Sequence, residues 1–179
     1  PLWEHTDSLI AHLNITTGET IADIGCGSGF FTDKFSRLVG ETGRIYAIEI
    51  KDEHINTLND YINDEHITNV SVIKGKEDVL EFPEQVDKMF MCSLYHVLYG
   101  VTSDADRDKY LQSLVKLLKP DGELIIVDNG PVDDDTLPYH GPYISRELIE
   151  YQLRFYGFRL VDYYQIIPQR YMLKFKLSN

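Results

Sequence analysis

The sequence predicts an α/β fold built on a doubly wound, mostly parallel sheet with helices on both faces. Two observations support this fold class. Apolar, strand-length runs alternate with helical patterns along most of the chain, which favours parallel strands joined by right-handed crossovers. The last two strand-like segments, Phe158–Ile167 and Arg170–Leu177, are separated only by a short joint around Pro168. Such a joint allows a hairpin but no helical crossover, so we expect five parallel strands followed by an antiparallel pair.

The first half of the chain supplies three of the parallel strands. The segment Asp7–Ile15 has its apolar residues on one face, as in an amphipathic helix. An apolar strand follows at Glu19–Cys26, and the glycines at its end open a helix at Phe30–Leu38. The next strand, helix and strand are predicted at Arg44–Ile50, His54–Ile62 and Val70–Ile73.

The second half of the chain supplies the other two parallel strands and the hairpin. Val86–Cys92 is an apolar run of strand length, and Asp104–Lys119 is a long helix with one apolar side. The sequence Lys119-Pro120-Asp121-Gly122 predicts a turn, because Pro comes early and Gly late. The fifth strand is predicted at Leu124–Asp128, and a helix at Ser145–Phe155 precedes the hairpin.

Length and composition indicate one domain covering residues 1–179 with a core of its own. Hydrophobic residues make up 43% of the chain, but the apolar runs are too short to span a membrane. The net charge of −12, with scattered Lys and Arg, disfavours a nucleic-acid partner, because phosphate contacts need clustered positive charge. Two cysteines far apart fit a reducing, cytoplasmic compartment. The chain begins with Pro, so a lost amino-terminal signal stays an open alternative.

The stretch Ile21–Phe31, IADIGCGSGFF, is the strongest functional signal. Three glycines at alternate positions, Gly25, Gly27 and Gly29, follow the first predicted strand and open a helix. In an open sheet of this kind, ligands bind beyond the carboxyl ends of the strands. Glycines there allow positive φ and remove Cβ atoms that would hold a ligand away. A tight turn without a ligand is the alternative interpretation.

Glu49 makes a ligand the better interpretation. It ends the second predicted strand, at the distance where dinucleotide-binding folds place the acid that binds a ribose. NAD fits less well than S-adenosylmethionine. Phe30 stands where the NAD fingerprint has its last glycine, and the carboxylate of Asp23 suits an ammonium group better than a pyrophosphate.

Together these motifs resemble the class I S-adenosylmethionine-dependent methyltransferases. The likeness covers almost the whole chain: the loop IADIGCGSGFF, the acid in YAIEI, the strand DKMFMCSLYHVL, the turn LKPDG before LIIVD, and the closing hairpin. It implies a Rossmann-like sheet of seven strands with the last strand inserted antiparallel. A more detailed likeness, in Tyr95-His96 and in GFRLVDYYQIIPQRYMLKF, is to a loosely characterised bacterial subgroup with no secure substrate.

The resemblance also implies roles on the cofactor side. Asp23 would hold the ammonium group of S-adenosylmethionine, directly or through water, Glu49 would bind its ribose, and Ile50 would pack on its adenine. Either Glu77 or Asp78, in GKEDVL, would meet the adenine edge. The remaining predicted cofactor contacts belong to the glycine loop or to the end of the fourth strand, beside the methionine portion: Gly25, Cys26, Gly27, Ser28, Gly29, Cys92 and Ser93.

Methyl transfer to a hydroxyl or an amine benefits from a base of near-neutral pKa that removes the proton. His96, which follows the fourth predicted strand, is the first candidate, with its neighbour Tyr95 as a further catalytic candidate, and packing of an apolar loop is the alternative role of His96. His140, in the loop after the fifth strand, is the second, and a plain turn residue is the alternative there.

The pair Asp128-Asn129 resembles the pair that metal-dependent O-methyltransferases use to hold magnesium. Their companion acid at the end of the fourth strand is replaced here by Cys92 or Ser93, which are poor ligands for a hard cation, so we predict no metal site. The acidic surface expected from the net charge and the tyrosines on the expected loops suggest a small, partly apolar or cationic acceptor. We therefore predict an O- or N-methyltransferase acting on a small molecule. The alternatives are a non-catalytic S-adenosylmethionine-binding protein and an NAD-binding oxidoreductase.

Overall fold

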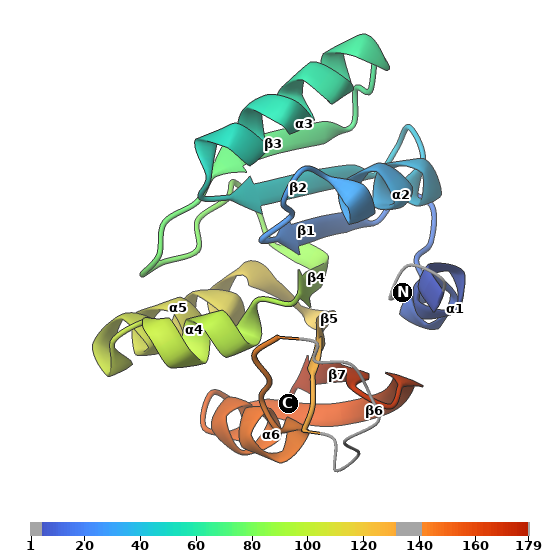
Figure 1. Ribbon diagram of the computed structural model, residues 1–179. Coiled ribbons are helices and arrows are strands. Elements are labelled where there is room, and N and C mark those ends of the chain that lie inside the picture. Colours follow the sequence, from blue (N-terminus) through green and yellow to red (C-terminus); the bar gives the residue numbers. More distant parts are fainter. Residues whose placement is uncertain (1–4, 132–140, 179) are drawn as a thin grey trace.

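The computed structural model describes residues 5–131 and 141–178, which form one seven-stranded sheet with helices around it (Figure 1). The strand order is β3-β2-β1-β4-β5-β7-β6. Strands β1 to β5 pair in parallel, whereas β7 lies antiparallel between β5 and β6. The predicted fold class is therefore confirmed, including the terminal antiparallel hairpin.

The strands coincide closely with the predicted apolar runs. The parallel strands are β1 (Thr20–Ile24), β2 (Arg44–Glu49), β3 (Val70–Lys74), β4 (Val86–Cys92) and β5 (Leu118–Asn129), and the hairpin strands are β6 (Phe158–Ile167) and β7 (Arg170–Leu177). Along the chain the sheet grows outward from β1 to β3 and then continues from the other side of β1 with β4. This reversal places the topological switch point between β1 and β4, where ligands bind in open α/β sheets.

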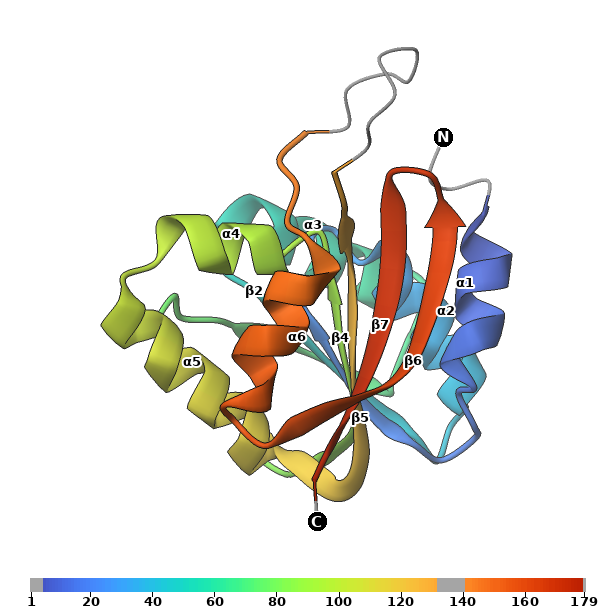
Figure 2. The same ribbon diagram turned by 90° about the horizontal axis from the view of Figure 1, so that it is seen from below.

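Helices cover both faces of the sheet. Figure 2 shows α1 (Thr6–Leu13) and α2 (Phe30–Val39) on one face, and α4 (Tyr95–Val101), α5 (Asp104–Leu117) and α6 (Arg146–Arg154) on the other. The remaining helix, α3 (Asp52–Asp64), packs along β3 and β2. Two buried apolar clusters correspond to the two faces. Serine N-caps begin α5 and α6: the hydroxyls of Ser103 and Ser145 accept hydrogen bonds from backbone N–H groups one turn later.

Two predicted details were wrong. The residues after Ser93 form the short helix α4 instead of a loop. The predicted turn at 119–122 belongs to β5, which begins at Leu118 because that residue is buried and pairs with Val86. The next pair is Lys88 with Glu123, so residues 119–122 bulge out of the ladder.

The antiparallel hairpin brings its turn to the same edge of the sheet as the ends of the parallel strands (Figure 2). Arg170, the first residue of β7, pairs with Asn129, the last residue of β5. We call this the carboxyl edge, and the opposite one the amino edge. None of the helices in the described residues is long and apolar enough to cross a membrane.

Candidate functional site

The glycine loop forms the first wall of the site at the carboxyl edge. Gly25, Gly27 and Gly29 all have positive φ, and Gly29 is the N-cap of α2. A Cβ atom at Gly27 would meet no protein atom within 4 Å, so the backbone there borders open space. Ser28 is exposed and Cys26 half-buried, and burial raises the pKa of the Cys26 thiol, which keeps it neutral.

Asp23 places a buried carboxyl group under this loop. Its side chain is only 2% exposed, and Oδ2 accepts a hydrogen bond of 2.6 Å from the Thr32 hydroxyl. Burial raises the pKa of Asp23 to about 7; the Thr32 bond opposes this rise and the nearby charge of Glu49 adds to it. Within residues 5–131 and 141–178, no cationic side chain forms an ion pair with Asp23. The loop therefore covers an acid whose charge is not compensated by the protein.

Glu49 is tied to the glycine loop through its carboxylate. Oε2 accepts from the N–H of Gly27 at 2.9 Å, and Oε1 accepts from the N–H groups of Ile50 and Lys51 at 2.7 and 3.0 Å. Burial alone would raise the pKa of Glu49, but these backbone donors, with help from His54, hold it below its usual value. Nδ1 of His54 lies 3.5 Å from Oε2. The structure thus fixes an ionised acid beside the open space at Gly27.

The other predicted adenine contacts lie further along the same side. Ile50 is 44% exposed, which leaves an apolar surface next to Glu49. Glu77 is exposed and Asp78 is half-buried, and the Asp78 carboxylate lies 3.9 Å from the Lys109 ammonium group on α5. Their part in cofactor binding stays a prediction.

His96 and Asp128 form a histidine–carboxylate pair on the other side of β4. Nδ1 of His96 lies 2.7 Å from Oδ1 of Asp128, and the backbone N–H of His96 donates to Oδ2 at 3.1 Å. The N–H of Asn129 donates to Oδ1 at 2.8 Å. Asp128 is fully buried, whereas the His96 side chain is 12% exposed. The helix α4, which begins at Tyr95, turns His96 onto the end of β5, so a buried acid orients an imidazole that is only slightly exposed.

Arg170 lies next to this pair. Its Nη1 donates to Oδ1 of Asn129 at 2.9 Å, and its Nη2 contacts Sγ of Cys92 at 3.2 Å and the hydroxyl of Ser93. Ser93 is exposed and has a left-handed φ of 56°. Burial raises the pKa of the Cys92 thiol, and the Arg170 charge opposes that rise. Cys92 and Ser93, predicted beside the methionine portion, are thus also in contact with an arginine.

The other two predicted catalytic residues do not join this group. Tyr95 is fully buried in the core, and its hydroxyl donates to Oε1 of Gln152 at 2.7 Å, which favours a packing role. His140 lies outside the described residues.

Sequence reasoning missed three residues of the site: Thr32, Asp128 as the partner of His96, and Arg170. Asp128 ends the apolar run LIIVD, so its place at the carboxyl edge was available from the pattern. Arg170 follows the short joint of the hairpin, and the first residue of an antiparallel strand must lie where its parallel neighbour ends. No sequence pattern indicated Thr32, because its hydrogen bond to Asp23 depends on how α2 packs against β1.

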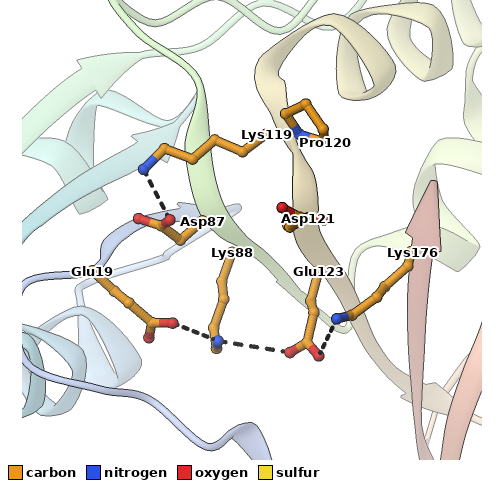
Figure 3. Close-up of a pocket in the computed structure, with 9 residues that line it drawn as sticks. Glu19, Asp87, Lys88, Lys119, Pro120, Asp121, Glu123 and Lys176 are labelled. Atoms are coloured by element: carbon orange, nitrogen blue, oxygen red, sulfur yellow. Dashed lines mark hydrogen bonds and ion pairs between the residues drawn. The ribbon is translucent and has the colours of Figure 1, made fainter. Parts of the chain in front are cut away.

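A cavity of about 360 Å³ lies at the opposite, amino edge (Figure 3). It is lined by charged residues from the starts of β4 and β5 and the end of β7. Nζ of Lys88 lies 2.7 Å from Glu19 and 3.7 Å from Glu123, and Nζ of Lys176 lies 3.8 Å from Glu123. Lys119 pairs with Asp87 at 2.8 Å. Each of the three lysines therefore has a carboxylate partner, and the cavity is remote from the glycine loop.

Comparison with protein families agrees with this geometry. A family model described as a methyltransferase domain matches residues 15–153. A similar curated relative is the ubiquinone/menaquinone biosynthesis C-methyltransferase UbiE of Escherichia coli, 33% identical over 115 residues. That match covers 64% of this chain and 44% of the relative, so the chain corresponds to less than half of that protein.

Solved structures agree in fold. A methyltransferase from Aquifex aeolicus described as dependent on S-adenosylmethionine superimposes with a TM-score of 0.80 at 25% identity, covering 94% of this chain and 87% of the other. The glycopeptide N-methyltransferase MtfA in complex with S-adenosylmethionine gives a TM-score of 0.74 at 10% identity, covering 98% of this chain and 87% of MtfA. At that identity, the second likeness concerns the fold alone.

Proposed function

The chain belongs to the class I S-adenosylmethionine-dependent methyltransferases, and we propose that it methylates a hydroxyl or an amine of a small acceptor with His96 as the base. The observation that carries this proposal is the 2.7 Å contact between Nδ1 of His96 and the buried Asp128. An acceptor of this kind loses a proton during methylation, and an oriented imidazole at the carboxyl edge can take it.

The residues at the glycine loop fit the cofactor. Gly27 leaves room for a ligand, Asp23 provides a buried carboxyl group for an ammonium group, and Glu49 provides an ionised carboxylate for ribose hydroxyls. S-adenosylmethionine supplies a methyl group activated by its sulfonium sulfur. We assign the ammonium group to Asp23, the ribose to Glu49 and the adenine face to Ile50. The rest of the loop, with Cys92 and Ser93, would contact the methionine portion.

Asp128 sets the tautomer of the imidazole. Because its carboxylate accepts from Nδ1–H, the lone pair of His96 is on Nε2, the nitrogen that faces away from Asp128. Nε2 then takes the proton of the acceptor as the new O–C or N–C bond forms and the C–S bond breaks. The carboxylate also stabilises the imidazolium that results. Asp128 is thus a positioning residue and His96 the catalytic one.

Transfer of tritiated methyl groups from S-adenosylmethionine to a metabolite extract tests the proposal. The wild-type protein should label a small product, and His96→Gln should lower the rate about 100-fold or more. Asp128→Asn should lower the rate and also shift the pH profile, which a merely structural change would not do. His12→Gln, a histidine on α1 whose ring stacks on Tyr164, is the matched control and should keep the wild-type rate.

Two results would contradict the proposal. An unlabelled extract, with S-adenosylmethionine still bound, would indicate a non-catalytic binding protein. A wild-type rate in His96→Gln would mean that another group removes the proton, and His140 would be the next residue to test.

A further inference from the structure

Arg170 is a buried cation without a counter-ion among the described residues. The residue is 7% exposed, and its three hydrogen-bonding partners, Asn129, Cys92 and Ser93, are all uncharged side chains in the arrangement described above. Across the described residues, no carboxylate forms an ion pair with it. Its Nε is buried and has no hydrogen-bond partner in that part of the chain. Burying a charge is unfavourable unless the charge is paired, so a group at this position suits an anionic ligand.

The strand order separates this cation from the acids assigned to the cofactor, although two of its partners, Cys92 and Ser93, adjoin the space assigned to the methionine portion. The acids assigned to the cofactor lie on β1 and β2, whereas Arg170 lies on β7, beyond β4 and β5. His96 contacts Asp128, and Arg170 contacts the next residue, Asn129. The guanidinium is also in contact with Ser93, an exposed residue. Base and cation are therefore held by consecutive residues at the end of one strand, and they reach this edge from opposite faces of the sheet.

We propose that Arg170 binds an anionic group of the acceptor, so that the preferred acceptors are small acids that carry a hydroxyl or an amine. This inference rests on the proposed function and narrows its substrate class. A guanidinium presents N–H donors in a planar fork that matches a carboxylate. The acidity of the chain as a whole would favour a cationic acceptor, but Arg170 provides a positive group at this edge.

Matched pairs of probes test the inference by binding, without the need for turnover. The protein is saturated with S-adenosylhomocysteine at fixed ionic strength and titrated with three acids and their amides. The pairs are glycolate and glycolamide, 4-hydroxybenzoate and 4-hydroxybenzamide, and anthranilate and anthranilamide. In at least one pair, the acid should bind the wild-type protein ten times more tightly than the amide. Arg170→Gln should remove that preference, and Arg170→Lys should keep part of it.

Lys174→Gln is the matched control, because Lys174 is also a buried cation of β7 but lies 4.0 Å from the Asp162 carboxylate. It should keep the preference for acids. The inference is overturned if every amide binds the wild-type protein as well as its acid, a result that does not depend on how any variant folds. It is also overturned if the preference survives in Arg170→Gln.

The cofactor is the other source of a carboxylate, and a second titration separates it from the acceptor. S-adenosylhomocysteine and its decarboxylated analogue are compared on the wild-type protein and on Arg170→Gln. The wild-type protein and Arg170→Gln should prefer S-adenosylhomocysteine over its decarboxylated analogue to a similar degree. A preference that Arg170→Gln abolishes would overturn the inference and assign Arg170 to the cofactor. If the wild-type protein does not bind S-adenosylhomocysteine at all, the cofactor assignment itself is contradicted.

Discussion

The two edges of the sheet pair their charged side chains differently. At the amino edge, each lysine around the cavity in Figure 3 has a carboxylate partner. At the carboxyl edge, in the part of the chain that the structure describes, Asp23 has no cationic partner and Arg170 no anionic one. Unpaired buried charges weaken folding unless something binds them. The comparison favours a structural role for the amino edge and supports the proposed ligand site at the carboxyl edge.

The comparison also shows why a cavity alone is a poor guide to the site. The cavity of about 360 Å³ lies at the edge where the lysines are already paired. The glycine loop borders open space without enclosing it, yet it has the two acids and the positive-φ backbone that a cofactor needs. Buried charged groups without a partner in the described part of the protein are the better indicator of the site here.

The largest expected effect is the pH dependence of Asp23. Its pKa is about 7 in the folded protein against an ordinary 3.8, a difference of about 4 kcal/mol. Because folding favours the protonated acid, this contribution to the stability of the ligand-free protein is present below about pH 4 and is lost as the pH rises through 7. Asp23→Asn has no carboxyl group to ionise, so its stability should not fall in this way. By pH 8 its free energy of unfolding should therefore exceed that of the wild-type protein by up to about 4 kcal/mol.

Urea unfolding of both proteins between pH 4 and pH 8 measures this gain. If the two proteins lose stability in parallel as the pH rises, the charge of Asp23 is compensated in the folded protein. The contrast between the two edges would then no longer include Asp23. Affinity for S-adenosylmethionine should follow the opposite trend in the wild-type protein and rise with pH, because an ionised Asp23 attracts the ammonium group.

The next effect concerns the paired edge. Lys88→Met should lower the free energy of unfolding by about 3 kcal/mol, because it removes the buried partner of Glu19 and leaves Glu123 with Lys176 alone. Affinity for S-adenosylmethionine should stay within about twofold of wild type, an energy change of about 0.4 kcal/mol. Thermal unfolding and calorimetry give the two values. A large loss of cofactor affinity would show that the two edges are not independent.

Much of this fold could be predicted from local patterns. The strands are short apolar runs, and the short joint around Pro168 requires a hairpin, so sheet and hairpin followed from sequence. The helix α4 did not, because it is only seven residues long, contains Gly100 and has no clear polar face. The start of β5 at Leu118 was missed because the pairing with Val86 is a tertiary contact.

The site was predictable only for residues that lie in the glycine-rich stretch or at a known sequence distance from it. Asp23 and the glycines lie in one stretch, and Glu49 lies at a known distance after it. The pairing of His96 with Asp128 joins residues 32 positions apart, and that of Arg170 with Ser93 joins residues 77 apart. Both depend on which strands are neighbours and in what register, and no local pattern contains that information.

Glu49→Gln tests the unpaired edge through binding. The variant keeps one oxygen for the Ile50 and Lys51 donors but loses the negative charge and the acceptor for the Gly27 N–H, so affinity for S-adenosylmethionine should fall about 30-fold, or about 2 kcal/mol. Glu19→Gln at the amino edge is the control, and it should bind the cofactor as the wild-type protein does. Calorimetry measures both, with NAD as a ligand that should give no comparable binding. Unchanged affinity in Glu49→Gln would place the ribose elsewhere.

The smallest effect is the most specific. Gly27→Ala and Gly157→Ala both add a methyl group at a positive φ, +56° and +82°, and neither Cβ would meet a protein atom within 4 Å. Each should therefore cost about 1 kcal/mol of stability through backbone strain alone. Only Gly27→Ala should weaken S-adenosylmethionine binding, by about tenfold or 1.4 kcal/mol, because its methyl group enters the space assigned to the ligand. Since the strain is matched, an equal affinity in the two variants would mean that the open space at Gly27 is not where the cofactor binds.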